Sequence, residues 1–443
     1  MALLALAGCA SYHAKPLRAP ALADMAAPTQ KALAHAARRL RVPGMPSLTL
    51  NFRKPLTGKE LGVLAVLANP QLKALRARAQ IARAQVFSAG LLPDPVVQFS
   101  ALKPYGAGAE GRSTSLTDGF LWDLSRLVTR NTDIRIAKEH AAAIDYEIAW
   151  REWLAANHAR LTARRLYWLD QEWRVAHRAA VLWGRREKFL AIDARRHLIA
   201  GPRALVWDTA LDSLRLKTAL LKRSVQSARF SLDQQLGLPP GARLAIAPPA
   251  AAVLPKASAQ ALFKEALQRR LDLVALVAAY HSADNALLRA VLDQYPRLSL
   301  GFAGARNTSG VSEAGIQLSL VLPLFNGNRG AVAIARARRR ALFKGYVARL
   351  AAARAQIYKL RSMDQSLSHE VSELRLRDQA LTGLARSALV SYKAGALGLF
   401  PYLTLMQELL TVRLQLTALH LSQAAAAIAL QTATATPWSG ARS

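Results

Sequence analysis

The sequence predicts an elongated α+β protein in which long helical hairpins carry four short β-strands. Three observations lead to this fold class. Residues 127–236 and 327–432 each have helical periodicity over a length far beyond that of a helix in a compact domain. Four short segments alternate polar and apolar residues with period two, which is the pattern of strands with two different faces. The same order of elements also occurs twice along the chain.

The composition agrees with a helix-rich, ordered protein. The 443 residues are 52% hydrophobic, largely Ala and Leu, and 60 Lys and Arg against 28 Asp and Glu give a net charge of +32. The apolar fraction excludes a disordered chain, and a single cysteine excludes a disulfide framework or a Cys-rich metal site. No stretch offers about 20 predominantly apolar residues, which argues against an inner-membrane transporter.

Residues 1–9 have the shape of a bacterial lipoprotein signal, because an apolar run ends in Leu6-Ala7-Gly8-Cys9. We expect Cys9 to be the acylated N-terminus of an exported protein; the alternative is an incidental free thiol. No Lys or Arg precedes the run, and the run is shorter than the usual core of about 7–15 residues. A misplaced start codon would explain both departures. An irregular, Pro-containing arm is expected at residues 10–58.

The first β-hairpin is expected at about residues 95–124. Its strands are Val97–Ala101 and Leu116–Trp122, separated by the Gly-rich stretch Gly106–Gly111. That stretch lacks the Gly-Lys-Ser/Thr ending of a phosphate loop, and no helix follows it. We therefore interpret it as a hairpin loop.

The second β-hairpin is expected at about residues 296–324. Its strands are Arg297–Phe302 and Ile316–Leu322, with a polar loop from Gly304 to Gly310. Two hairpins cannot close a barrel, so their open edges and apolar face need partner chains or lipid. Packing as a small soluble sheet against helices is the alternative.

Each hairpin is expected to follow one helix, at 60–91 and 259–293, and to precede a long helical hairpin. The long segments are interrupted at Gly201 and Gly395, where glycine allows the chain to reverse after a helix. Arms of about 65 and 35 residues result, and at about 1.5 Å per residue the longer would span on the order of 100 Å. A coiled coil, a fibre or a tube needs helices of this length.

The chain is a duplication. Leu72 and Leu273 are 201 positions apart, and so are Pro95 and Pro296, each of which opens a strand. We predict a first repeat at 59–236 with its tip near 201 and a second at 259–432 with its tip near 395. A Pro-rich linker at 237–258 joins them, and a tail occupies 433–443.

No constellation typical of an enzyme or a metal site stands out. The nine histidines are scattered without metal-ligand spacing, and no nucleophile–base pair, nucleotide loop or paired carboxylate is found. We expect no catalysis, no bound metal, and no cofactor other than a lipid on Cys9. The tryptophans between Trp150 and Trp183 are interpreted as knobs in helix packing, with stacking of aromatic substrates in a lumen as the alternative. Trp122 would suit an interfacial aromatic girdle.

The strong positive charge has three possible explanations. A positive lumen would favour anionic cargo. Basic rims would meet lipid phosphates. In an acidic habitat, partly protonated carboxylates would lose their value in ion pairs.

The sequence resembles the TolC-like outer membrane factors from residue 9 to about 435. In the first copy the resemblance lies in Ala68–Leu72 and Ala89–Pro95, and in the second in Leu318–Gly330, where Leu-Pro-Leu-Phe-Asn-Gly-Asn-Arg is the most specific run. The segment Ser391–Gly395 also resembles the family, and the Cys-containing start is similar to its lipoprotein members.

This resemblance implies a homotrimer in which each chain gives four strands to one 12-stranded outer-membrane β-barrel and four helical arms to a periplasmic tube. The tube would dock on a periplasmic adaptor and an inner-membrane pump, often of the resistance–nodulation–division type. The implied docking residues at the periplasmic tip are Leu198, Gly201, Tyr392 and Gly395. The implied strand boundaries are Pro95, Pro296 and Pro323.

The sequence departs from the family pattern at several places. Trp122–Ser125 stands where the second copy has Leu322–Phe325, so the two strand-to-helix turns are expected to differ. Leu271 replaces a proline that is usual in the second copy. Aspartates that narrow the entrance in some members correspond here to Pro401 and Thr404, which gives no support to an acidic ring.

The sequence thus predicts an outer-membrane channel lipoprotein that extends into the periplasm and conducts substrates from an adaptor and pump to the cell exterior. It would contact outer-membrane lipid and no nucleic acid. One alternative is the exit duct of a protein-secretion system. The other is a soluble, basic coiled-coil protein that binds nucleic acid, for which salt-dependent binding is expected.

Overall fold

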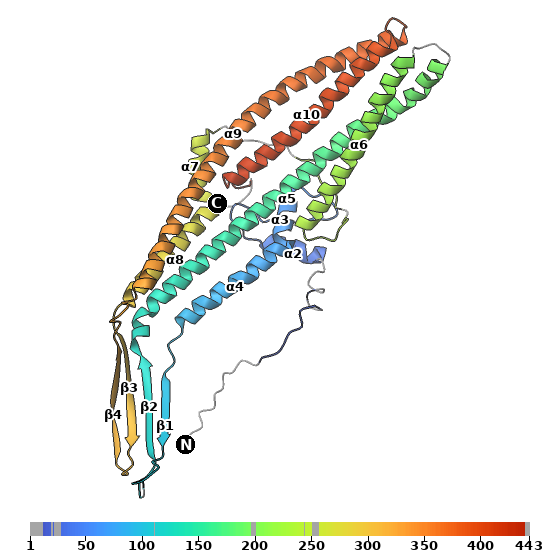
Figure 1. Ribbon diagram of the computed structural model, residues 1–443. Helices are drawn as coiled ribbons and strands as arrows, with labels where there is room; N and C mark the ends of the chain where they lie inside the picture. Colours follow the sequence, from blue (N-terminus) through green and yellow to red (C-terminus); the bar gives the residue numbers. More distant parts are fainter. Residues whose placement is uncertain are drawn as a thin grey trace.

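The computed structural model describes residues 12–18, 21, 28–109, 111–195, 201–242, 244–249 and 257–438. These residues form a long rod with a β-sheet at one end and two helical tips at the other (Figure 1). Cys9 and Leu198 lie outside the described residues.

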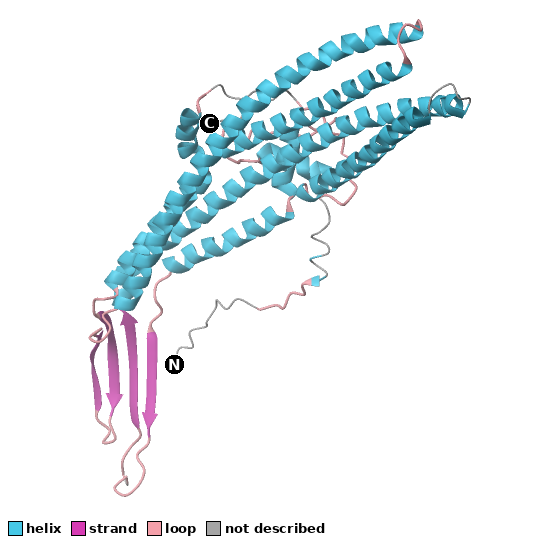
Figure 2. Ribbon diagram, turned by 45° about the horizontal axis from the view of Figure 1, so that its top comes forward, coloured by secondary structure: helices cyan, strands magenta, loops and turns pink. Residues whose placement is uncertain are grey.

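The sheet has four antiparallel strands in the order β1-β2-β3-β4, so β1 and β4 are its edges (Figure 2). Pro95 and Pro296 directly precede the first strand of each hairpin, and Pro323 follows the last strand by two positions. The strands are β1 (Val96–Leu102), β2 (Ser115–Asp123), β3 (Arg297–Arg306) and β4 (Ser312–Val321). The prediction of four strands in two hairpins is confirmed.

The second hairpin is longer than the alternation of its residues indicated. The expected loop began at Gly304, but Gly304 pairs with Ala314 and the ladder continues to Arg306. The turn instead forms around Asn307, whose side chain accepts hydrogen bonds from the backbone N–H groups of Ser309 and Val311. Small residues carried no alternation signal, and this is why the prediction ended the strand too early.

Two long helical hairpins follow the strands. The helix α5 (Leu124–Arg195) has 72 residues and packs against α6 (Gly201–Gln235). Likewise, α9 (Arg329–Lys393) has 65 residues and packs against α10 (Leu399–Ala433). At about 1.5 Å per residue, α5 and α9 each reach on the order of 100 Å. Within the described residues, no helix combines the length and the apolar character that crossing a membrane requires.

The helices that precede the strands are each broken once, so the prediction of uninterrupted helices was wrong. The first divides into α3 (Gly58–Ala68) and α4 (Pro70–Gly90), and the second into α7 (Ala259–Arg269) and α8 (Leu271–Leu292). At the first break the Asn69 side chain caps α4 by accepting from the N–H groups of Gln71 and Leu72, and Pro70 takes the first helical position.

The second break lies at Arg270, the repeat equivalent of Asn69. No proline follows, because Leu271 occupies that position. The backbone of Arg270 is extended at ψ 107°, and its side chain is bound to Asp272 and to the backbone carbonyl of Ala433 at the end of α10. Tertiary contacts therefore hold the second break where a proline marks the first.

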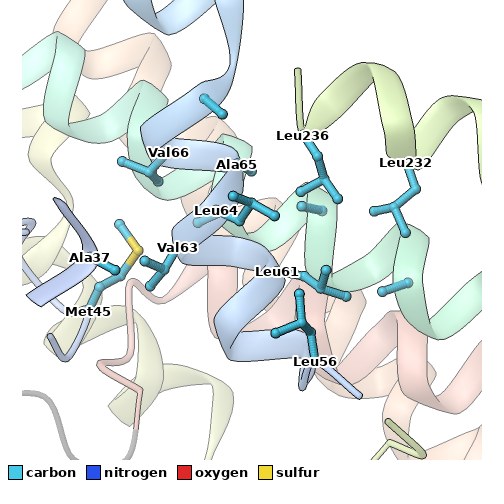
Figure 3. Packing of buried hydrophobic residues seen from close by; sticks show 14 of the residues in the cluster. Ala37, Met45, Leu56, Leu61, Val63, Leu64, Ala65, Val66, Leu232 and Leu236 are labelled. Atoms are coloured by element: carbon cyan, nitrogen blue, oxygen red, sulfur yellow. The ribbon is translucent and has the colours of Figure 1, made fainter. Parts of the chain in front are cut away.

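The largest hydrophobic core lies midway along the rod. Leu61 and Leu64 of α3 pack there with Leu232 and Leu236 at the end of α6, and Leu56 lies beside them (Figure 3). The N-terminal arm contributes a helix that the sequence did not indicate, α2 (Gln30–Arg39). Its Ala37 joins this core, and Trp438 near the C-terminus is 1% exposed in it. The segment of α2 and the chain end at Trp438 are thereby both attached to the core at mid-length.

The helices form a curved layer with two open edges. The continuous helix α5 packs against α4 and α8 in the half near the sheet and against α6 and α10 in the distal half. The helix α9 packs against α8 and α10 (Figure 1). One edge of the layer therefore consists of α4 and α6, and the other of α9.

Candidate functional site: the open sheet and the distal helical tips

The sheet has one strongly apolar face. Because paired residues of an antiparallel ladder point to the same side, the register assigns the faces. One row across all four strands consists of Val97, Phe120, Phe302 and Ile316. The next row towards the helices holds Trp122, Leu300 and Leu318. Within the described part of the chain nothing covers this face, since Val97, Phe302 and Ile316 are 76%, 67% and 75% exposed.

The opposite face is mostly polar or small, and its larger apolar residues, Val96, Leu102, Leu121 and Val321, lie towards the strand ends. It carries Gln98, Thr117, Ser299, Gln317 and Ser319 together with Gly119, Gly301 and Gly315. Alternation of this kind is typical of strands that separate lipid from water, with apolar residues outside and polar residues inside. The strands have 7, 9, 10 and 10 residues, close to the 9–11 residues with which a tilted strand spans a bilayer.

One glycine is required where β2 and β3 lie closest. A Cβ atom on Gly301 would lie 1.8 Å from the backbone oxygen of Phe120 and 2.9 Å from the Cα of Leu121. Gly315 lies on the same face in β4 and would meet nothing within 4 Å. The alternation pattern did not single out Gly301, since a strand glycine gives no side-chain signal.

The open edges of the helical layer expose apolar side chains. On α9, Phe343, Leu376 and Val390 are each at least half exposed, and on the opposite edge Phe87 of α4 and Phe230 of α6 are also exposed. Together with the unpaired outer sides of β1 and β4, they leave a single chain with two uncovered margins along its length. Margins of this kind need a second copy or another partner.

The two strand-to-helix turns differ, as the sequence indicated. In the first repeat β2 runs directly into α5, and Asp123 accepts from the N–H groups of Ser125 and Arg126. Trp122 is half-buried at this junction, and its indole N–H donates a hydrogen bond to the carbonyl of Pro93 at 2.7 Å. In the second repeat residues 322–328 form a turn, and Asn328 adopts a left-handed φ of 52° before α9 begins.

The turn between α9 and α10 is a glycine-terminated helix end. Gly395 has a φ of +76°, its N–H donates to the carbonyl of Tyr392 at 3.1 Å, and the N–H of Ala396 donates to the carbonyl of Ser391 at 2.9 Å. This pair of hydrogen bonds defines a Schellman motif, which favours glycine at the left-handed position. Tyr392 stacks on Tyr402 of α10 with ring centroids 5.2 Å apart, so the predicted tip residues Tyr392 and Gly395 lie together.

The other distal tip lies between α5 and α6. Gly201 is the first residue of α6. Below this tip Trp183 of α5 packs on Trp207 of α6 with centroids 4.8 Å apart, and Arg215 binds Glu187 across the same pair of helices at 2.7 Å. Figure 1 places this tip beside the tip of α9 and α10, at the end of the rod opposite the sheet.

Pro401 and Thr404 lie in the first turns of α10. The hydroxyl of Thr404 donates to the carbonyl of Phe400 at 3.0 Å. Neither side chain carries a charge, so these two positions contribute no acidic ring to the distal end.

The tryptophans of α5 pack between helices. Trp150, Trp153 and Trp183 are at most 7% exposed. Trp168 stacks on His420 of α10 with centroids 5.1 Å apart. These contacts agree with the interpretation of the tryptophans as knobs in helix packing.

A buried network of charged side chains stabilises the break between α7 and α8. Arg270 and Asp272 are 4% and 6% exposed, and two hydrogen bonds of 3.0 and 2.7 Å join the guanidinium to the carboxylate. Arg349 of α9 reaches the same carboxylate at 2.8 Å, and Arg270 stacks over the ring of Trp150. The network thus connects α5, α8, α9 and the end of α10. The sequence did not predict this network, although Arg270 and Asp272 stand among leucines at the start of a helix, where buried charges indicate an ion pair.

No group of three or more His, Cys, Asp or Glu side chains is arranged to hold a metal among the described residues.

His420 is expected to make the stability of the distal helices depend on pH. Burial, and next the charge of Arg375, lower the pKa of His420, while a hydrogen bond to Gln423 partly opposes them. The unfolded chain therefore binds a proton at higher pH than the folded chain, and stability falls as pH decreases below about 6.5. We expect His420→Gln to flatten the decline of the unfolding temperature between pH 7 and 5. His158→Gln, at an exposed position of α5, is the control, and equal pH profiles for both variants would contradict the assignment.

Comparisons with known proteins identify the fold. No protein-family model and no curated protein matches the sequence. Solved structures do match. The outer-membrane channel OprN has 16% identity and a TM-score of 0.73, with 86% of this chain and 90% of that chain covered. The outer membrane protein VceC of Vibrio cholerae has 18% identity and a TM-score of 0.70, covering 85% and 95%.

A third match is the CmeC outer membrane channel of Campylobacter jejuni, with 15% identity, a TM-score of 0.73 and 87% of both chains covered. The chain therefore has the fold of these outer-membrane channels, over nearly the whole length of each. The resemblance to TolC-like outer membrane factors is confirmed at the level of the fold.

Proposed function

We propose that this protein is the outer-membrane channel of a tripartite efflux system and works as a homotrimer. The observation that carries the proposal is the two-faced, four-stranded sheet with both edges open, placed at one end of a helical layer that is itself open on both sides. Three copies joined edge to edge would close a 12-stranded barrel and complete a helical tube at the same time.

Each face of the sheet then has a defined environment. The row of Val97, Phe120, Phe302 and Ile316 would contact outer-membrane lipid, and the polar face with Gln98 and Gln317 would line a water-filled lumen. Apolar side chains along α9 would cover those of α4 and α6 in the next copy. The helices would extend into the periplasm, and the chain would conduct substrates without catalysing a reaction.

The distal tips are the proposed docking site for a periplasmic adaptor, which would connect the channel to an inner-membrane pump of the resistance–nodulation–division type. This end of the rod lies opposite the sheet and contains Gly201, Tyr392 and Gly395. Energy for transport would come from the pump.

We also propose that Cys9 carries the lipid of an outer-membrane lipoprotein. The support is the sequence Leu6-Ala7-Gly8-Cys9. Metabolic labelling with a fatty-acid analogue tests this proposal, since Cys9→Ser should abolish the label and an unlabelled parent protein would refute it.

Gly395→Pro should abolish complementation of an efflux-deficient strain. Proline fixes φ near about −65°, whereas position 395 has a φ of +76°, and proline also lacks the N–H that binds Tyr392. Gly395→Asn is the matched control, because asparagine tolerates the left-handed conformation. Resistance to the pump's substrates should fall to that of the deletion strain with proline and persist with asparagine.

Membrane fractionation must accompany that assay. The parent protein and both variants should be recovered in the outer-membrane fraction as a species of about three times the mass of the mature chain. Full resistance with Gly395→Pro would contradict the docking assignment. Recovery of the parent protein in the soluble fraction would overturn the channel itself and favour the nucleic-acid-binding alternative.

A further inference from the structure

A positively charged cavity lies at mid-length, away from both the sheet and the distal tips. Its volume is about 320 Å³, and three segments that are distant in sequence form its walls. These are the first turn of α3 with Thr57, Gly58 and Lys59, one side of α5 with Arg160, Arg164 and Tyr167, and the inter-repeat linker from Ile246 to Pro249.

The walls are held in place by backbone pairing. The N–H of Leu56 donates to the carbonyl of Ala245 at 2.8 Å, and the N–H of Ala247 donates to the carbonyl of Leu56 at 2.9 Å. This parallel bridge attaches the linker beside the start of α3. The two prolines at 248 and 249 further restrict the backbone of the linker, which forms one wall of the cavity.

Three cationic side chains line this cavity, and none of its described lining residues is acidic. Arg160 is 8% exposed, and it donates to the neutral oxygens of Asn157 at 2.6 Å and Gln431 at 2.9 Å. Its guanidinium also lies over the Trp438 ring, 4.5 Å from the centroid. The nearby carboxylate of Glu60 is engaged with the N–H and hydroxyl of Thr57 in a capping box.

Burial disfavours the charged forms of all three cations, and neighbouring positive charge adds to this effect for Arg160 and Lys59. Burial, and next the charge of Arg164, lower the pKa of Arg160 to about 10. Burial and the charge of Arg160 lower the pKa of Lys59, and burial lowers that of Arg164. A neighbouring anion would act in the opposite direction on all three groups. The first turn of α3 adds backbone N–H groups that have no acceptor within the helix and a positive helix end.

We infer that this cavity binds a small oxyanion of the phosphate type, held by Lys59, Arg160 and Arg164 beside the start of α3. A tetrahedral oxyanion accepts several charge-assisted hydrogen bonds at once, and the volume admits one small anion with ordered water. The bound anion would connect the start of α3, α5 and the linker between the repeats. It would thereby stabilise the middle of the rod, in addition to the channel function proposed above.

Calorimetric titration of the full-length protein in detergent tests this inference. The probe is inorganic phosphate in a phosphate-free buffer of constant ionic strength, with chloride as the comparison anion. We expect saturable binding of one phosphate per chain and a higher unfolding temperature in phosphate than in chloride. Glycerol phosphate distinguishes the source, since tighter binding than inorganic phosphate would indicate a lipid headgroup and weaker binding a free anion.

Substitutions decide whether the cavity is the binding site. Arg164→Gln and Lys59→Gln should each weaken phosphate binding at least about tenfold, because each removes a charge-assisted hydrogen bond. Arg336→Gln, at an exposed position of α9, should leave the affinity unchanged. If Arg164→Gln does not fold, Lys59→Gln decides alone. Absence of saturable binding in the parent protein, or an unchanged affinity in a folded cavity variant, would overturn the inference.

Discussion

Gly301→Ala is expected to prevent assembly of the proposed trimeric channel. The added Cβ atom would lie 1.8 Å from the backbone oxygen of Phe120, so β3 and β2 could not keep their pairing at this row. Because both contacting atoms belong to the backbone, no side-chain rotation can relieve the overlap. We expect a destabilisation of about 3 kcal/mol or more, because overpacking typically costs about 1–3 kcal/mol and an overlap with backbone atoms lies at the upper end of that range. Native electrophoresis of outer-membrane extracts should show loss of the trimer.

Gly315→Ala is the control for this prediction. Gly315 lies on the same polar face in the neighbouring strand β4, and its Cβ position is open to at least 4 Å. The substitution is chemically identical, so a normal trimer with Gly315→Ala separates the steric effect from a general intolerance of the sheet to alanine. A normal amount of trimer with Gly301→Ala would show that β2 and β3 are farther apart than described.

Asp272→Ala is expected to cause the second large loss of stability. It would leave Arg270 buried at 4% exposure without its carboxylate partner, beside Arg349, which uses the same carboxylate. Breaking one partner of a buried ion pair costs about 3–5 kcal/mol, because the remaining charge cannot be solvated. Guanidinium unfolding followed by circular dichroism should show the shift in midpoint.

Two further variants test the reason for that loss. Glu265→Ala removes an exposed ion pair with Arg269 on α7 and should cost no more than about 0.5 kcal/mol. Adding Arg270→Met to Asp272→Ala should restore part of the stability, since it removes the unpaired charge. If the double variant is less stable than Asp272→Ala alone, the charge is not the cause of the loss.

Much of the fold could be predicted because its signals are local and periodic. The strands around Val97 and Ile316 were evident from alternation, since their two faces meet different environments. The reversal at Gly395 was evident because a left-handed helix end favours glycine, and the structure gives this residue a positive φ. The length of α5 and α9 followed from uninterrupted helical periodicity.

The features that the sequence did not indicate depend on contacts between distant segments. The break at Arg270 has no proline and is held by Asp272, Trp150 and the carbonyl of Ala433, which come from three different helices. The cavity at mid-length combines Lys59 and Arg164 across more than a hundred residues. The need for glycine at 301 arises from the backbone of the neighbouring strand. Periodicity within one element contains none of this information.

The division of the shorter helices at mid-length has a mechanical consequence. Among the described helices, only α5 and α9 continue from the sheet to the distal tips, whereas α4 and α8 begin, and α6 and α10 end, near the central core. A displacement of the shorter distal arms would therefore not pull directly on any strand. In the proposed trimer, an aperture at the far end could then widen or narrow while the wall in the membrane kept a fixed diameter.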